Sequence, residues 1–225
     1  MPRRRRLPSL VASTLATAVL AVTLGGCFTG KRPSFADDQF SAGKPTGDAA
    51  IDAVLAKLDL ATNHPPTFTA TYDIVVRFGN LDKTATVAVD GRNRSVTMGD
   101  VRYVQTPDVV ETCRGTTCTT GLDAAAFSDS MLTVDFAIAD AAKRLRLDAA
   151  AKIGPTATRT EQVAGQEATC VDVVQSTGTA SYCVLDAGVL AKLTDADVYV
   201  TLTSFAATVD PSLFTPPTES TPVPG

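Results

Sequence analysis

The sequence predicts an α+β fold in which a strongly curved antiparallel sheet carries an N-terminal helix and a helical insert on its concave side. Apolar residues recur at every second position through most of the chain, which is the period of a β-strand. Short turns rich in Gly, Asn and Asp separate these segments and favour antiparallel hairpins. So little of the chain has a helical period that helices cannot cover a flat sheet of roughly ten strands, and we expect the sheet to curl on itself.

The first 26 residues are expected to be a secretory signal peptide. Four arginines at positions 3–6 precede residues 7–24, which carry no charge, and the run ends in Leu24-Gly25-Gly26-Cys27. This ending looks like a bacterial lipobox, in which the cysteine thiol is diacylated and the chain is cut just before it. We therefore expect lipidation at Cys27. The alternative is a plain signal peptide with an incidental cysteine or an uncleaved anchor helix, although the apolar run is short for a membrane span.

A lipid on Cys27 would hold the mature chain at the extracytoplasmic face of the cell membrane, because two or more acyl chains anchor a protein stably. Residues 27–47 are rich in Gly, Pro, Ser and charge, and we expect them to form a flexible tether. Without the four arginines of the signal, 16 basic residues face 24 acidic ones, and the basic residues are dispersed. This net charge of −8 argues against a nucleic-acid partner. Separately, we expect the protein to be a monomer.

The folded domain is expected over residues 48–210, and it begins with an amphipathic helix over about residues 48–60. Its apolar stripe has the spacing of one helix face and consists of Ile51, Val54, Leu55 and Leu58. Asp48 lies near the start, where a negative charge suits the helix dipole. The helix is expected to end before His64-Pro65-Pro66, because the residue before a proline disfavours helical angles.

A long strand follows, in which alternate residues form one apolar face: Phe68, Ala70, Tyr72, Ile74, Val76 and Phe78. Turn residues at Asp90-Gly91 and Gly99-Asp100 divide the next stretch into strands near 82–89, 93–98 and 101–106. A further hairpin is expected around Cys113 and Cys118.

Between Leu122 and Ile153 the chain is rich in alanine and leucine and shows no strand alternation. Val134, Ile138, Ala141 and Leu145 trace one helical face, which predicts a helix over about residues 133–150 that ends before Gly154-Pro155. Strands resume at about 156–163, 167–175, 180–185, 189–193 and 197–205. Residues 211–225 are a Pro-rich tail that cannot join the interior of a sheet.

Four cysteines remain when Cys27 is assigned to the lipid, and they allow three pairings. Local spacing favours Cys113–Cys118 and Cys170–Cys183, because each pair flanks a polar turn. The oxidising exterior permits both disulfides. A zinc site is the alternative, but the Cys-x4-Cys spacing is loose and the only histidine is distant in sequence.

An N-terminal amphipathic helix, a long alternating strand, a helical insert and a closing run of strands after a lipobox resemble the LolA-like carrier superfamily. The nearest relatives would be the actinobacterial lipoproteins of the LppX/LprG type. The C-terminal part of the resemblance lies in residues 182–190, 201–205 and 210–214. It implies a half-open β-barrel whose helices plug an apolar cavity, and a function in shielding the acyl chains of lipids or lipoproteins. The cysteine pairs depart from this pattern, since they are not a general feature of the family.

A cavity of this kind would be lined by alternate residues of the sheet. The candidates are Phe68, Ala70, Tyr72, Ile74, Val76, Phe78, Val87, Val89, Val96, Met98, Val198, Val200 and Leu202. A closed core packed by the two helices would show the same alternation. We therefore expect a protein that binds or carries lipids, lipoglycans or lipidated molecules, with a protein-interaction module that has a solid core as the alternative.

The chain is not expected to be an enzyme, and we expect neither a cofactor nor a metal. His64 is the only histidine and lies beside two prolines in a predicted connector, so it is a poor base for a Ser-His-Asp triad. The sequence has no Gly-rich phosphate loop, HExxH or EF-hand pattern. Paired aspartates could serve glycoside hydrolysis, but the chain has no tryptophan, on which sugars often stack.

Overall fold

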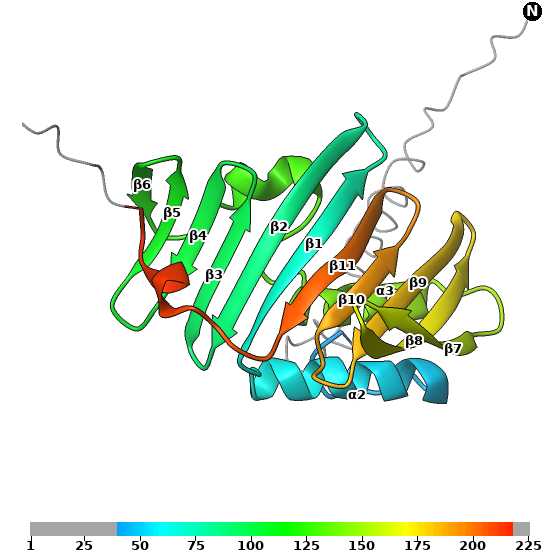
Figure 1. Ribbon diagram of the computed structural model, residues 1–225. Coiled ribbons are helices and arrows are strands. Elements are labelled where there is room, and N and C mark those ends of the chain that lie inside the picture. The colour runs from blue at the N-terminus through cyan, green and yellow to red at the C-terminus, as the bar shows by residue number, and fades with distance from the viewer. Residues whose placement is uncertain (1–39, 218–225) are drawn as a thin grey trace, which may run out of the picture. The chain divides into compact units, whose positions relative to one another are not determined.

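The computed structural model describes residues 40–217 and shows an α+β fold with one open antiparallel sheet of eleven strands (Figure 1). The predicted fold class, a curved half-open barrel, is confirmed. The strands are β1 (Phe68–Val76), β2 (Leu81–Asp90), β3 (Asn93–Met98), β4 (Val101–Gln105), β5 (Val110–Arg114), β6 (Thr117–Thr120), β7 (Ala157–Val163), β8 (Gln166–Gln175), β9 (Gly178–Leu185), β10 (Leu190–Thr194) and β11 (Val198–Ala206). Cys27, the predicted lipidation site, lies outside the described residues.

The order of the strands is β6-β5-β4-β3-β2-β1-β11-β10-β9-β8-β7. Two runs of consecutive hairpins therefore meet at the centre, where β1 pairs antiparallel with β11. The first run ends at β6 on one edge of the sheet, and the second begins at β7 on the opposite edge. The connection between them, residues 121–156, must cross a face of the sheet, and we call this segment the insert.

Helix α2 (Ala49–Asn63) forms where the apolar stripe predicts it and ends three residues later than expected. Asp48 is its N-cap, and its carboxylate accepts hydrogen bonds from the amides of Ala50 (3.0 Å) and Ile51 (3.3 Å). The predicted stripe is buried against the sheet, with each of its four residues at most 2 % exposed.

The insert corrects the helix predicted over residues 133–150. It contains a 3₁₀ helix, η2 (Ala124–Ser130), and an α-helix, α3, that spans only Ala139–Ala150. Residues 134–138 form turns in which the amides of Ile138 and Asp140 both donate to the carbonyl of Asp135 (3.1 Å each). Ala137 also accepts a hydrogen bond from the Leu190 amide of β10 (2.8 Å), so a tertiary contact replaces the helical hydrogen bond that a longer α3 would make.

The core lies between the concave face of the sheet, α2 and the insert. Tyr72 is fully buried at its centre, and its hydroxyl donates to the Leu190 carbonyl (3.0 Å). The Phe136 ring of the insert meets the Tyr72 ring edge-on, with 5.0 Å between their centroids. Burial raises the pKa of Tyr72 far above its usual range, which suits a phenol that acts only as a hydrogen-bond donor.

The convex face carries the C-terminal segment. Residues 207–217 follow β11 and include a 3₁₀ helix, η3 (Pro211–Phe214), which lies against β3 on the side of the sheet opposite the insert (Figure 1). The Arg102 guanidinium of β4 donates to the carbonyls of Ser212 (3.3 Å) and Leu213 (2.5 Å).

Among the described residues, no helix is long and apolar enough to cross a membrane.

Candidate apolar binding site

The residues predicted to line a cavity lie together on the concave face, with one exception. Twelve of the thirteen are at most 2 % exposed, and they come from β1, β2, β3 and β11. The pairing of β1 with β2 and β11 places Tyr72 opposite Ala85 on one side and Leu202 on the other. The strand alternation thus brings these side chains to one continuous apolar face.

Phe78 is the exception, because its side chain is 88 % exposed. Strand β1 ends at Val76, and residues 77–80 form the turn to β2, in which Gly79 and Asn80 have positive φ angles of 89° and 48°. The alternation of a strand stops where its backbone turns, so the position of Phe78 in the pattern does not place it on the concave face.

The concave face is filled rather than hollow. Where Phe68, Val87 and Val89 face the insert residues Val134 and Ile138, the remaining space is about 10 Å³. Such a space is close to the minimum of about 10–15 Å³ that holds one water molecule, and it is far too small for an acyl chain.

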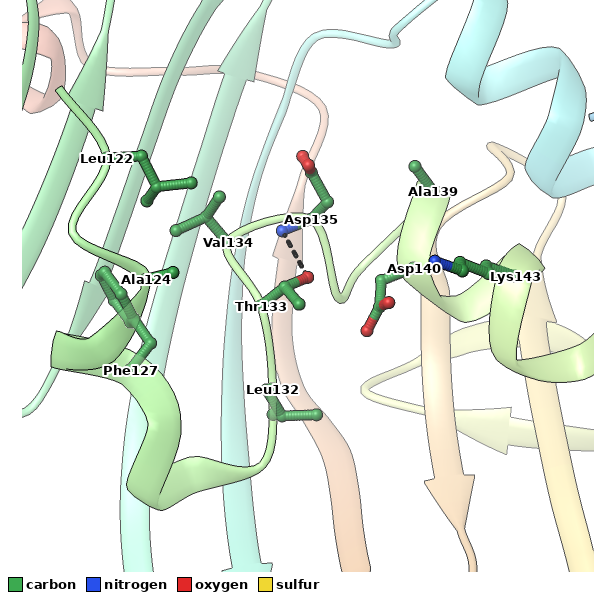
Figure 2. Close-up of a pocket in the computed structure, with 10 residues that line it drawn as sticks. All are labelled: Leu122, Ala124, Phe127, Leu132, Thr133, Val134, Asp135, Ala139, Asp140 and Lys143. Atoms are coloured by element: carbon green, nitrogen blue, oxygen red, sulfur yellow. Dashed lines mark hydrogen bonds between the residues drawn. The ribbon is translucent and has the colours of Figure 1, made fainter. Parts of the chain in front are cut away.

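A larger apolar pocket lies within the insert itself, with a volume of about 360 Å³ (Figure 2). Its lining consists of Leu122, Ala124, Phe127, Leu132, Thr133, Val134, Asp135, Ala139, Asp140 and Lys143. None of these residues is among the cavity candidates predicted from the sequence. The alanine- and leucine-rich composition of the insert does not distinguish the wall of a pocket from the buried face of a helix, which is what the sequence predicts for this segment.

Local chain geometry builds the pocket. The Asp123 carboxylate caps η2 by accepting from the Ala125 amide (3.0 Å), and η2 presents Phe127 to the pocket (Figure 2). Met131 follows in the left-handed region with φ of 57° and turns the chain, so that Leu132 and Val134 lie across from Phe127. The Thr133 hydroxyl then accepts a hydrogen bond from the Asp135 amide (3.2 Å).

Contacts with the sheet hold the insert in place. Lys83 of β2 forms an ion pair with Asp129 (2.6 Å), and Arg94 of β3 forms one with Asp135. On the other half of the sheet, the Tyr182 hydroxyl of β9 donates to the Asp148 carboxylate of α3 (2.6 Å). The insert is therefore connected to strands on both sides of the central β1–β11 pair.

The charges around the pocket are mostly paired. Asp135 is neutralised by Arg94, and Asp140 accepts a hydrogen bond from Arg144 (3.2 Å) in an i,i+4 ion pair. Burial lowers the pKa of Arg94 from its usual value, which reflects how far this guanidinium is withdrawn from water. Lys143 is exposed, and within residues 40–217 it has no carboxylate at ion-pair distance.

Both predicted disulfides, Cys113–Cys118 and Cys170–Cys183, are confirmed. Each joins residues that face each other directly on neighbouring antiparallel strands, in the β5–β6 and β8–β9 hairpins. Because the sulfur atoms are bonded to each other, they are not free thiolates, and the zinc alternative is wrong. The Glu161 carboxylate lies beside the second disulfide and pairs with Lys192 (2.8 Å), whose hydrogen bond lowers the pKa of Glu161.

A comparison with family models finds no match for the chain, and a comparison with curated proteins finds none either. Solved structures that resemble it include MucB, at 14% identity over 73% of this chain and 61% of that one, with a TM-score of 0.49. The Pseudomonas aeruginosa MucA/MucB complex matches at 14% identity over 74% and 60%, with a TM-score of 0.47.

LprF from Mycobacterium bovis matches at 13% identity over 72% of this chain and 94% of LprF, with a TM-score of 0.39. The chain spans about three fifths of the length of MucB (61%).

Proposed function

We propose that this protein is a non-enzymatic lipoprotein at the extracytoplasmic face of the cell membrane that binds the acyl chain of a lipid or lipidated molecule. The observation that carries the proposal is the apolar pocket of about 360 Å³ in the insert. Its volume is within the range of small-molecule sites, about 300–1,000 Å³. The membrane anchor at Cys27 rests on the lipobox-like sequence alone.

The lining of the pocket supports an apolar ligand. Phe127 and Leu132 form its buried wall at 2 % and 4 % exposure, while Leu122 at its margin is 49 % exposed. Apolar surface that leaves water contributes roughly 25 cal/mol per Å², so a chain that covered Leu122 would gain free energy of binding.

The pocket is also adjacent to the concave face of the sheet. Val134 and Asp135 line both this pocket and the small space beside Phe68, Val87 and Val89. A displacement of this one segment would join the two spaces, which gives a longer acyl chain a route toward the apolar face predicted from the sequence.

The filled concave face favours a second candidate function. A protein with a solid core, in which about 10 Å³ remains where Phe68, Val87 and Val89 face the insert, can act as a docking module for another protein of the cell envelope. In that case the pocket in the insert would be a surface depression without a lipid.

Mass spectrometry of the protein extracted from its native membrane tests the proposal. We expect acyl lipid to co-purify with the wild type and with Ala125→Trp, but not with Ala124→Trp. Both alanines are exposed neighbours in η2, and only Ala124 lines the pocket, so only its replacement fills the space. A lipid-free wild type that retains one specific protein partner would favour the docking module instead.

A further inference from the structure

Lys143 is the one charged side chain of the pocket lining that has no ion-pair partner within residues 40–217. The two carboxylates of the lining each pair with an arginine: Asp135 pairs with Arg94, and Asp140 shares Arg144 with Asp195 (3.6 Å). Figure 2 shows Lys143 among the residues that line the pocket.

The position of Lys143 relative to the apolar lining gives the site two chemically different parts. Phe127, Leu132 and Val134 form a buried apolar wall, whereas Lys143 is exposed on α3 at the solvent side. Helix α3 begins at this pocket with Ala139, and its first turn carries Asp140, whose negative charge suits the helix dipole.

We infer that the pocket selects a single-chain amphiphile with an anionic headgroup, a carboxylate or a phosphate. Its acyl chain would lie along Phe127, Leu132 and Val134, and its headgroup would accept a charge-assisted hydrogen bond from the Lys143 ammonium. A cationic headgroup would meet the Lys143 ammonium, while both carboxylates of the lining already pair with arginines, so it is disfavoured. This inference rests on the proposed acyl-chain binding and adds the class of ligand.

Titration of the full-length protein with four amphiphiles that share a dodecyl chain tests the inference, each below its micelle concentration. We expect dodecanoate or dodecyl phosphate to bind about tenfold more tightly than neutral dodecyl maltoside, since the anionic headgroup adds a charge-assisted hydrogen bond to the burial of the chain; tenfold corresponds to about 1.4 kcal/mol. Dodecyltrimethylammonium should bind most weakly. A preference for dodecanoate indicates a free fatty acid, and a preference for dodecyl phosphate indicates a phospholipid headgroup; either result supports the inference.

Variants of Lys143 separate its role from that of the apolar wall. Lys143→Gln should lose the tenfold preference for the anionic probes while its affinity for dodecyl maltoside is retained, and Lys143→Arg should keep the preference. The control is Lys44→Gln, because Lys44 is also exposed but does not line the pocket, and this variant should bind like the wild type.

Two outcomes distinguish this inference from the proposed function. Equal binding of the neutral and anionic probes by the wild type, or an unchanged preference in Lys143→Gln, overturns the anionic selectivity and leaves acyl-chain binding intact. A wild type that binds none of the four probes overturns both.

Discussion

Gly188 occupies a position with no room for a side chain. It lies in the turn between β9 and β10 with φ of 74°, directly against α2. A Cβ atom at this position would lie 2.3 Å from the Lys57 carbonyl oxygen and 2.6 Å from the Ala61 Cβ. The absence of a side chain therefore allows both the left-handed turn and the close approach of the helix.

We expect Gly188→Ala to lower the free energy of unfolding by about 2 kcal/mol or more, because left-handed strain of about 1–2 kcal/mol adds to a clash with helix backbone. Urea denaturation measures the loss. Gly91→Ala is the matched control, since Gly91 has φ of 60° but no atom within 4 Å of the added Cβ. Equal losses in the two variants would show that the contact with α2 is unimportant.

Asp48 combines the cap of α2 with a contact to the chain beyond α3. Its second carboxylate oxygen bonds to Lys152 and Thr156, and the side chain is 17% exposed. The hydrogen bond from Lys152 is the main cause that lowers the pKa of Asp48 from 3.8 to about 2.

A lowered folded-state pKa stabilises the protein above the unfolded-state pKa, and this stability is lost as the pH falls through the folded-state value. We expect the Asp48 contribution, on the order of 1–2 kcal/mol, to disappear between about pH 4 and about pH 2. Asp48→Asn should show a correspondingly smaller fall of the free energy of unfolding over this range. Asp82→Asn is the control, because Asp82 is exposed and has no ion pair within residues 40–217. In this variant the free energy of unfolding should fall as much as in the wild type.

At the scale of elements, a buried ion pair joins the two α-helices of the described chain. Arg146 of α3 is 3 % exposed and pairs with Asp59 of α2. Asp59 also accepts a hydrogen bond from the Gly43 amide (2.9 Å), so the pair connects three segments of the chain.

Removal of one partner leaves a buried charge without compensation, and we expect Arg146→Met to cost about 3–5 kcal/mol of stability. The double variant Arg146→Met, Asp59→Leu should recover most of the loss, because two apolar side chains of similar size need no partner. Thermal or urea unfolding of both variants checks this. A double variant as unstable as the single one would show that the geometry of the pair, rather than its charge balance, stabilises the α2–α3 contact.

At the scale of the whole molecule, the proposed attachment to the membrane depends on a single residue, Cys27. We expect Cys27→Ser to move the protein from the membrane fraction to the medium, or to leave it unprocessed, because serine has no thiol for acylation. Fractionation and mass spectrometry of the N-terminus check the outcome. Membrane retention with normal cleavage would contradict the lipobox assignment.

The features that the sequence predicts well are those that depend on neighbouring residues. The alternation of a strand places Phe68, Ala70 and Tyr72 on one face of the sheet, regardless of which segments pack against that face. Each of the two disulfides closes a short hairpin, so its pairing also depends on residues close in sequence. The α3 prediction began too early because Val134 and Ile138 are buried by contacts in turns, and burial by tertiary contact imitates the period of a helix. The pocket could not be predicted, since it depends on where the insert crosses the sheet, which no local pattern encodes.

The central pairing of β1 with β11 also has a consequence for the time course of folding. Val76 pairs with Val198 and Thr69 with Ala206, so these contacts close loops of more than a hundred residues. Long-range pairing of this kind slows folding, because the entropy of a large loop is lost before the contacts form. When the chain is synthesised from its N-terminus, one edge of β1 stays unpaired until β11 has also been synthesised. If the chain is exported, as proposed above, we expect the sheet to be completed after translocation, with β1 as the segment most in need of protection from aggregation until then.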